Sequence, residues 1–422
     1  MRETREWNDI PRLAAAFVVA AFLGACTDIE GNQGEIGGSS VVVAPTDARD
    51  DRAVAASYWK TMVDNALINS NGMVAGKLAP SDLIWRAGDL PLKGTATVVP
   101  WSQSYWSFSS GGVQRRLQTG QSDYPILTKS AVLKLDSLGL SKLSPTEKYD
   151  ILMNFLEDDA SSPHHFLTTK QMRSYVRTEN AKGFALGGFC HAWATLATAV
   201  QEPKERTIEG LLHLGNVSLK FSSADIAALM SLNVHLNQSW ALDHGRYAEV
   251  GRRCSARQAP GAASPKLVNG TDCGSINAGT FHVIVTNQLG RRGLPVIVDT
   301  RPDYVVLNEP LFSYVIEESS QVAKLSFEGP LAPNTATAKF YRMKAEYAVS
   351  PVDPIFAGGA RIKKIRWHAY RVELDSTGEV IGGSWARKTE SYTKPDFVWT
   401  LAPPPETESL PKLGILTGKS AP

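Results

Sequence analysis

The sequence lacks the short motifs that mark several well-known classes of enzyme. Its 422 residues contain no His-Glu-x-x-His zinc motif, no Cys-x-x-Cys dithiol and no Gly-x-x-x-x-Gly-Lys phosphate loop. No calcium-binding loop, internal repeat or long low-complexity tract is visible either. These absences argue against a metalloprotease, a dithiol oxidoreductase, a P-loop nucleotide hydrolase and a repeat protein.

A strong charge of either sign is also missing. The 44 Lys and Arg residues nearly balance 42 Asp and Glu residues, which leaves a formal net charge of +2. Because there is also no basic stripe with interleaved aromatic residues, we expect no nucleic-acid partner. With 43% hydrophobic and 20% charged residues, the composition is that of a soluble globular protein. The length allows two or three domains with a sizeable core.

The N-terminal region has the pattern of an export signal. Leu13 to Leu23 form an apolar run that is too short to span a bilayer but typical of a signal peptide. The following Leu-Gly-Ala-Cys resembles the bacterial lipobox, which predicts a lipoprotein signal peptide at 1–25 and acylation, with palmitate, of Cys26. Thr27 favours outer-membrane anchoring on the periplasmic side. The alternative is an ordinary signal peptide followed by an incidental cysteine.

Cysteine is scarce, with four residues in the chain. If Cys26 carries lipid and Cys190 carries chemistry, Cys254 and Cys273 remain, in a segment rich in Gly, Ser, Asn and Pro. An exported chain can oxidise them, and a bridge would close a loop of about 20 residues, worth about 3 kcal/mol in the chain-entropy model. The alternative is two free thiols.

Composition and periodicity divide the chain into segments. Alternating polar and apolar residues predict strands at 336–349, 361–374 and 379–385, the last two joined by a turn at 375–378. We expect five segments: a signal peptide at 1–25, a flexible tether at 26–52, a helical and aromatic-rich region at 53–150, a catalytic core at 151–330 and a C-terminal β-rich region at 331–422.

Three helix starts can be located. Ser144 is placed as an N-cap, Pro145 stands at the first helical position, and Glu147 can close a capping box. A further helix is expected at 223–230. The run from Cys190 to Val200 follows a glycine-rich approach and also reads as a helix.

Cys190 is the candidate nucleophile. A thiol at a helix N-terminus is stabilised as thiolate by the unpaired N–H groups and the helix dipole. Residues 281–285 are predicted as one strand and 294–299 as its return, across a turn-rich loop at 287–293, which would bring His282 to Asp299. A base oriented by a carboxylate and facing a thiol is a generalised catalytic triad.

Several other readings stay open. Cys190 could simply pack in the core, as most buried cysteines do. His244, in a polar loop, is a rival base. His164 and His165 lack further ligands at metal spacing, so we expect a loop pair and no metal site. Trp193, three residues after Cys190, could wall the acyl site or serve only packing.

The motifs together resemble the transglutaminase elicitor family, known from oomycete cell-wall transglutaminases and from bacterial exported proteins. The resemblance runs in order over most of the chain after the export signal. The residues that carry it are Pro100-Trp101, Tyr105-Trp106, Ser144-Pro145-Thr146-Glu147-Lys148-Tyr149-Asp150, Gly188-Phe189-Cys190-His191-Ala192-Trp193-Ala194, Asp225 to Leu229, Gly251 to Cys254, Phe281-His282 to Asp299, Val306 to Pro310, Ile381 to Trp385 and Pro395 to Trp399.

The resemblance implies an α+β fold with a papain- or transglutaminase-like core, in which a helix-borne Cys packs on an antiparallel sheet bearing His and Asp. It implies a protein-glutamine γ-glutamyltransferase: Cys190 forms a thioester with a protein glutamine, and a primary amine resolves it. No cofactor is needed. Gly111 stands where relatives carry an acidic residue. Leu307 and Glu309 replace Trp and Gln in the stretch that plant hosts recognise, which puts elicitor activity in doubt.

Two other functional classes compete with acyl transfer. The same triad with open access to water makes a cysteine peptidase or amidase that acts on envelope peptides. A dry, aromatic-walled acceptor site favours amines, and the Trp and Tyr residues before 110 lean that way. A lipid-anchored scaffold without activity is the third class, and the intact Cys190, His282 and Asp299 argue against it. The sequence leaves the oligomeric state open.

Overall fold

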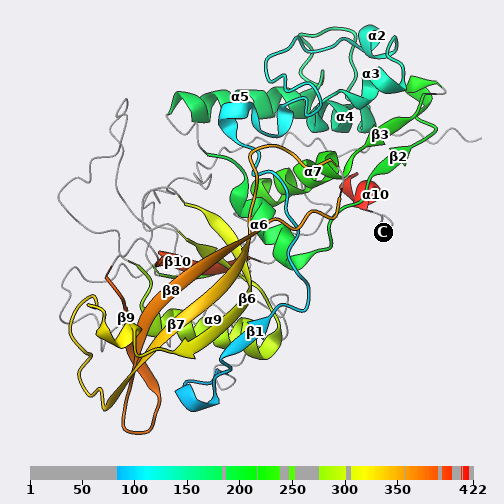
Figure 1. Cartoon of the computed structure of the whole chain (residues 1–422). Coiled ribbons are helices and arrows are strands. Elements are labelled where there is room, and N and C mark those ends of the chain that lie inside the picture. The colour runs from blue at the N-terminus through cyan, green and yellow to red at the C-terminus, as the bar shows by residue number, and fades with distance from the viewer. Residues whose placement is uncertain are drawn as a thin grey trace, which may run out of the picture.

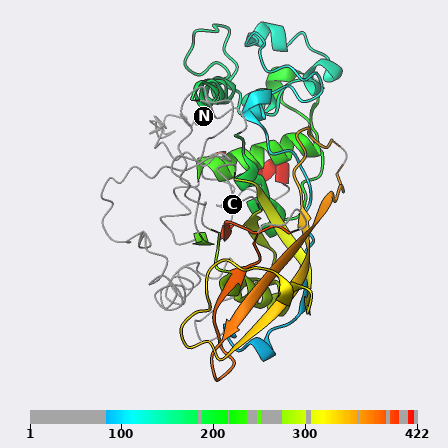
Figure 2. The same cartoon turned by 60° about the vertical axis from the view of Figure 1, so that its left-hand side comes forward.

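The structure is a computed structural model that describes residues 83–182, 187–215, 217–237, 247–251, 275–300, 306–356, 358–387, 392–401, 410 and 412–417. Its helices and an antiparallel sheet form two parts of an elongated molecule (Figure 1). The view turned by 60° shows the same two parts (Figure 2). The mixed helix and antiparallel-sheet architecture confirms the predicted class. The predictions on residues 1–82, His244, Cys254 and Cys273 lie outside the described residues.

The helical part, which includes a small two-stranded sheet, is built mostly from residues before 240. Its elements are η3 (Phe108–Ser110), η4 (Gly112–Gln114), α2 (Lys129–Val132), α3 (Ser137–Ser141), α4 (Pro145–Leu152), α5 (Leu167–Ala181), α6 (Cys190–Ala199), β2 (Arg206–Ile208), η5 (Leu212–Leu214), β3 (Leu219–Phe221), α7 (Ser223–Leu236) and α10 (Leu413–Thr417). All three predicted helix starts are confirmed, at α4, α6 and α7.

Helix α4 shows how the local sequence fixes this part. Ser144 caps the helix and Glu147 completes the capping box as expected. Lys148 then forms a buried ion pair with Asp225 of α7, with 2.7 Å between Nζ and Oδ2. Asp150 accepts hydrogen bonds from the backbone of Thr168 and Thr169 at the start of α5. Burial raises the pKa of Asp150 to about 6, against the opposing effect of these hydrogen bonds. The Ser-Pro-x-Glu-Lys-Tyr-Asp element therefore joins three helices.

The sheet part contains eight strands within the described ranges. Seven follow the order β4-β10-β5-β6-β7-β8-β9, with antiparallel neighbours, and β1 pairs with β6. The elements are η2 (Ala87–Asp89), β1 (Lys93–Thr95), β4 (Tyr247–Gly251), α9 (Ala278–Val285), η7 (Thr286–Arg291), β5 (Val296–Asp299), β6 (Asn308–Glu318), η8 (Val322–Lys324), β7 (Thr337–Ala348), β8 (Lys363–Leu374), β9 (Val380–Trp385) and β10 (Phe397–Leu401).

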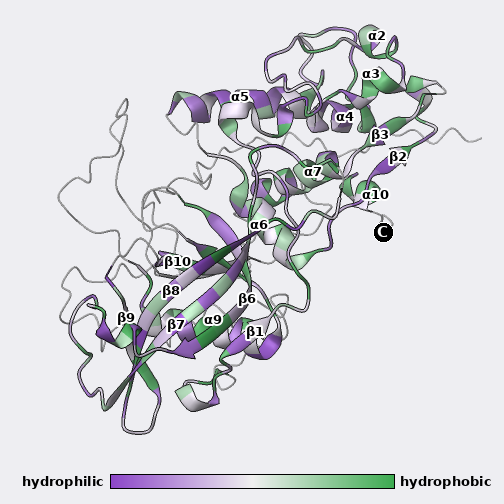
Figure 3. Cartoon of the chain, viewed as in Figure 1, coloured by the Kyte–Doolittle hydropathy of each residue, from purple (hydrophilic) through white to green (hydrophobic). Residues whose placement is uncertain are grey.

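The long strands confirm the alternation seen in the sequence. Strands β7, β8 and β9 coincide within two residues with the predicted ranges, and polar and apolar residues alternate along β7 (Figure 3). The turn between β8 and β9 contains Gly378 at a φ of 83°, a left-handed conformation that glycine adopts without steric cost. Because β5 and β6 pair with strands from beyond residue 331, the predicted segment boundary at 330 crosses one continuous sheet.

The prediction of a strand at 281–285 is wrong: these residues lie in helix α9. Asn277 caps the helix, accepting hydrogen bonds on Oδ1 from the backbone N–H groups of Gly279 and Thr280. A short apolar run fits a buried helix as well as a strand, so periodicity cannot separate the two. The residues expected to form the hairpin loop continue as the π-helical η7.

Glycines explain how α9 lies so close to β9. A Cβ on Gly279 would overlap the backbone of Gly382, and a Cβ on Gly383 would overlap the backbone of Gly279. Nearby, the Trp385 indole donates to the carbonyl of Ile276 at 2.6 Å. The Gly-Gly-Ser-Trp signature therefore serves to dock α9 on the sheet. In the part of the chain that the structure describes, no helix is long and apolar enough to cross a membrane.

Candidate active site

Cys190 is the first residue of α6 and is 3% exposed. An aromatic segment holds the chain that leads into it: the backbone N–H of Phe189 donates to the carbonyl of Tyr105 at 2.7 Å. Gly188 lies against Tyr105 so closely that a Cβ would not fit. The Tyr-Trp motif and the Gly-Phe-Cys motif are thus in direct contact, which fixes where the sulfur sits.

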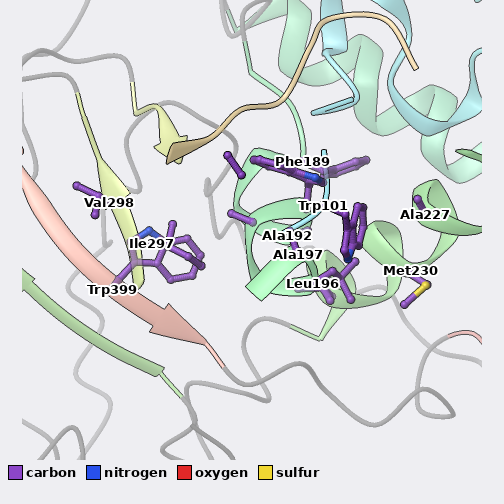
Figure 4. Packing of buried hydrophobic residues seen from close by; sticks show 14 of the residues in the cluster. Trp101, Phe189, Ala192, Leu196, Ala197, Ala227, Met230, Ile297, Val298 and Trp399 are labelled. Atoms are coloured by element: carbon purple, nitrogen blue, oxygen red, sulfur yellow. The ribbon is translucent and has the colours of Figure 1, made fainter. Parts of the chain in front are cut away.

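Helix α6 joins the two parts of the molecule. It packs against α7 on one side and against β5 and β6 on the other. Figure 4 shows this position, with Ala227 and Met230 of α7 on one side and Ile297 and Trp399 of the strands on the other. The start of a helix carries unpaired N–H groups and a partial positive charge. Cys190 therefore meets the sheet in a setting that favours a thiolate.

Asn308 is the strand residue that contacts this sulfur, and Trp399 holds Asn308. The Asn308 side chain donates from Nδ2 to Cys190 Sγ at 3.3 Å. The Trp399 indole Nε1 donates in turn to Asn308 Oδ1 at 2.8 Å. All three side chains are buried. A chain of two hydrogen bonds thus runs from Trp399 of β10 through Asn308 at the start of β6 to the Cys190 sulfur.

Asp299 lies beside this chain of hydrogen bonds. It ends β5, where it is paired with Asn308, and its Oδ1 accepts the backbone N–H of Leu307 at 2.9 Å. Its carbonyl accepts the backbone N–H of Asp396, which belongs to the Pro-Asp-Phe-x-Trp motif. Asp299 is therefore paired with the residue that contacts Cys190, and the triad itself stays a prediction.

His282 is not brought to Asp299, because the predicted hairpin does not exist. Its ring stacks on Tyr341 with 5.1 Å between centroids, and its Nδ1 lies 3.0 Å from the Tyr370 hydroxyl. Tyr341 pairs with Glu318 at one end of β6, whereas Asn308 is at the other end of this 11-residue strand. At about 3.3 Å per residue, His282 and Cys190 lie on the order of 20–30 Å apart.

Burial also makes His282 a poor base. The ring is completely buried on the helix-covered side of β7 and β8, and desolvation lowers its pKa to about 3. A histidine with this pKa does not take up a proton near neutral pH. The geometry therefore gives no support to a catalytic role for His282 and indicates a core residue.

Three of the other described histidines, His165, His191 and His235, have polar neighbours of their own. His235 Nδ1 lies 3.3 Å from His191 Nε2, and burial lowers the pKa of His235 to about 4. His165 contacts the carbonyl of Glu157, and no group of metal-ligating side chains occurs within the described ranges. Trp193, also predicted near the thiol, is fully buried in the core.

The sulfur of Cys190 is in a disulfide. Cys190 is the one cysteine within the described ranges, and its partner lies outside them. A sulfur in a disulfide is not a nucleophile, because only the thiolate attacks. The structure therefore presents the candidate nucleophile in an oxidised form, which a thiol reductant must open before any acyl transfer.

Sequence reasoning missed Asn308 and Trp399 as site residues. Both stand inside motifs that carry the family resemblance, Val306 to Pro310 and Pro395 to Trp399. The sequence does not show that they touch, because Asn308 and Trp399 are 91 positions apart and meet only through the pairing of β10, β5 and β6. Spacing along the chain does not reveal such a contact.

Comparison with known proteins identifies the family. No curated protein sequence matches the chain. Among solved structures, the GP42 transglutaminase from Phytophthora sojae matches with a TM-score of 0.53 and 16% identity, over 84% of this chain and 96% of that one. At this identity the match speaks for the fold alone. The model of the transglutaminase elicitor family matches residues 80–418, which is most of the sequence, and the chain therefore belongs to that family.

Proposed function

We propose that the protein is a transglutaminase-type thiol acyltransferase with Cys190 as its nucleophile. The observation that carries the proposal is the Cys190 sulfur itself, at the N-terminus of α6 and in hydrogen-bonding contact with Asn308. Helix dipole and donor together favour the thiolate. Family membership supports the reaction class, and the donor and acceptor that fit it are a protein glutamine and a primary amine.

The chemistry proceeds in two stages. The thiolate attacks the glutamine carboxamide carbon, a C–S bond forms, and a tetrahedral oxyanion develops. A protonated base gives its proton to the departing nitrogen, ammonia leaves, and a thioester remains on Cys190. The primary amine then attacks the thioester carbon and gives a proton to the base, the C–S bond breaks, and the thiolate and the protonated base are restored. The steps need no cofactor.

We propose His244 as the base, with Asp299 as its orienting carboxylate. Two observations support this proposal: the other histidines are elsewhere engaged or exposed, and Asp299 lies beside Asn308. His244 was the rival to His282 on sequence grounds, and His282 is buried against Tyr341, whose strand partner lies at the end of β6 opposite Asn308. Of the remaining histidines, His164 is exposed. The others have polar neighbours: His165 contacts Glu157, His191 contacts His235, His213 contacts Ile151 and His368 contacts Tyr347.

The decisive experiment is incorporation of an amine. Reduced protein is incubated with a glutamine-bearing donor protein and a millimolar primary amine, and the adduct is measured by mass spectrometry. We expect a covalent adduct on glutamine that is absent with Cys190→Ala, because a positioned amine outcompetes bulk water for the thioester. Glutamate without adduct, across several amines and donors, would show that the site is an amidase or peptidase.

The membrane anchor is a separate proposal that rests on the lipobox at Leu23 to Cys26. We propose that Cys26 is acylated and holds the protein at the outer membrane. Replacement of Cys26 by Ser should release the protein from isolated membranes and leave amine incorporation by the reduced enzyme unchanged. Equal membrane retention of the variant would contradict the anchor.

A further inference from the structure

Asn308 contacts the sulfur that the proposed reaction uses, and the structure shows this contact with the sulfur in its disulfide form. It is the first residue of β6, is 5% exposed, and donates from Nδ2 to Cys190 Sγ at 3.3 Å. We propose that Asn308 is a catalytic residue that holds Cys190 as the thiolate by donating its amide N–H to the sulfur. The inference rests on the nucleophilic role proposed above for Cys190.

Trp399 fixes which end of the Asn308 amide faces the sulfur. An indole Nε1–H is a donor only, so the atom 2.8 Å from it must be the amide oxygen. The amide nitrogen then points to Cys190, and the usual ambiguity between the two ends of an Asn side chain does not arise. A flipped amide would leave two donors facing each other at Trp399 and the oxygen facing the sulfur.

Once Cys190 is reduced, the donor bears on the charge state of its sulfur because the site is buried. Cys190 is 3% exposed, and burial alone favours the neutral thiol. A hydrogen bond donated to the charged form, together with the dipole of α6, opposes that effect. An exposed thiolate is stabilised by hydration. At this buried position the hydrogen bond from Asn308 takes the place of water.

The same donor contributes to both stages of the reaction. When the C–S bond forms, the negative charge leaves the sulfur, and the hydrogen bond from Asn308 weakens. When the amine resolves the thioester, the C–S bond breaks and the sulfur departs with its electron pair as thiolate, which the amide N–H again stabilises. Asn308 therefore acts on the resting enzyme and on the leaving group of deacylation.

The test measures the ionisation of Cys190 without any acyl substrate. The full chain is reduced, treated with iodoacetamide over a range of pH, and the Cys190 peptide is quantified by mass spectrometry. In Asn308→Ala we expect the midpoint of alkylation to rise by about one pH unit, since one lost charged hydrogen bond shifts a pKa by that order. Asn308→Asp should raise it further, because a carboxylate repels the thiolate.

Trp399→Phe and Trp385→Phe form a matched pair. Both remove one buried indole N–H bond, but only Trp399 is bonded to Asn308, whereas Trp385 donates to Ile276. We expect a smaller rise of the alkylation midpoint in Trp399→Phe and none in Trp385→Phe. Thermal melting confirms that each variant is folded, and where Asn308→Asp does not fold, Asn308→Ala and Trp399→Phe carry the test.

The outcomes separate this inference from the proposed function. Wild-type midpoints in folded Asn308 variants would overturn the role of Asn308, even where amine incorporation is observed. A raised midpoint in a protein that never incorporates an amine would leave the role of Asn308 standing as support of a reactive thiolate and would reject the transferase. A midpoint that rises equally in Trp385→Phe would mean a general loss of packing, and would also overturn the inference.

Discussion

The surroundings of Cys190 and those of His282 differ in what they do to a buried titratable group. Cys190 lies at the start of a helix and accepts a hydrogen bond from Asn308, which itself is held by Trp399. His282 lies in the final turns of α9, stacked on Tyr341, with its Nδ1 near the Tyr370 hydroxyl. The first setting favours a charged group, and the second favours a neutral one.

The difference teaches that a functional residue is recognised by its surroundings more than by its type. His282 stands in a motif that carries the family resemblance, yet desolvation lowers its pKa to about 3 and nothing charged is bonded to it among the described residues. The Phe-His element serves the packing of α9 on the sheet, where Phe281 contacts His368 and Trp385. The two regions can be separated by experiment, as follows.

The largest effect is expected from alanine at two histidines. His244→Ala should reduce amine incorporation by about 10²- to 10⁴-fold with little change in melting temperature, because it removes the proposed base. His282→Ala should keep most of the activity and lower the free energy of unfolding by about 2–4 kcal/mol, through the cavity and the lost aromatic contacts. Amine incorporation and urea unfolding are measured on both.

His282→Phe is the matched control for this comparison. Phe keeps a ring against Tyr341 and loses only the contact to the Tyr370 hydroxyl. It should therefore recover part of the stability lost in His282→Ala. If His282→Ala and His282→Phe are both inactive but fully stable, and His244→Ala is active, His282 is the base and the packing role assigned to it is wrong.

Much of the fold could be predicted from local signals. The capping box at Ser144 and the alternation along β7, β8 and β9 are contained in a few neighbouring residues, and the structure confirms them. Helix α9 could not be predicted, because its apolar run fits a buried strand equally well. The helix is selected by the close approach of Gly279 to Gly382 and Gly383, which is a contact between segments distant in the sequence.

The candidate site was predictable to the extent that it is local. The position of Cys190 at a helix start follows from the sequence around it, and α6 confirms that start. Asn308 and Trp399 could not be assigned, since strand pairing is what brings Asn308 to Cys190 and Trp399 to Asn308. The pairing of His282 with Asp299 failed because it depended on a hairpin that the chain does not form.

The second largest effect is expected from a thiol reductant, which should change the activity of the Cys190 region and leave the His282 region unchanged. Because the sulfur of Cys190 is in a disulfide, protein purified without reductant should incorporate amine at least tenfold more slowly than protein treated with dithiothreitol. Alkylation of Cys190 should rise in parallel. The buried surroundings of His282 should not respond, so near-ultraviolet circular dichroism of its aromatic neighbours serves as the control. Full activity in unreduced protein would contradict the inactive, oxidised form.

The smallest effect is on stability at acid pH, and it belongs to the His282 region. Desolvation lowers the pKa of the folded His282 to about 3, whereas an unfolded histidine has a pKa near 6.5. Between these values the unfolded chain binds a proton that the folded chain does not, so the free energy of unfolding falls as pH falls below about 6.5. Burial raises the pKa of Tyr341 and Tyr370, which stay neutral throughout this window.

The exact pKa of the folded His282 does not affect the size of this loss, provided that it lies below the lowest pH used. From pH 7 to pH 5, one such histidine lowers the free energy of unfolding by about 2 kcal/mol. His235 and His368, whose burial also lowers their pKa to about 4, act in the same direction. We therefore expect urea unfolding of His282→Phe to show a shallower loss between pH 7 and pH 5 than the wild type, by about 2 kcal/mol. Equal losses in the two proteins would mean that His282 takes up its proton in the folded state, as a base open to solvent would, and the contrast with Cys190 would no longer hold.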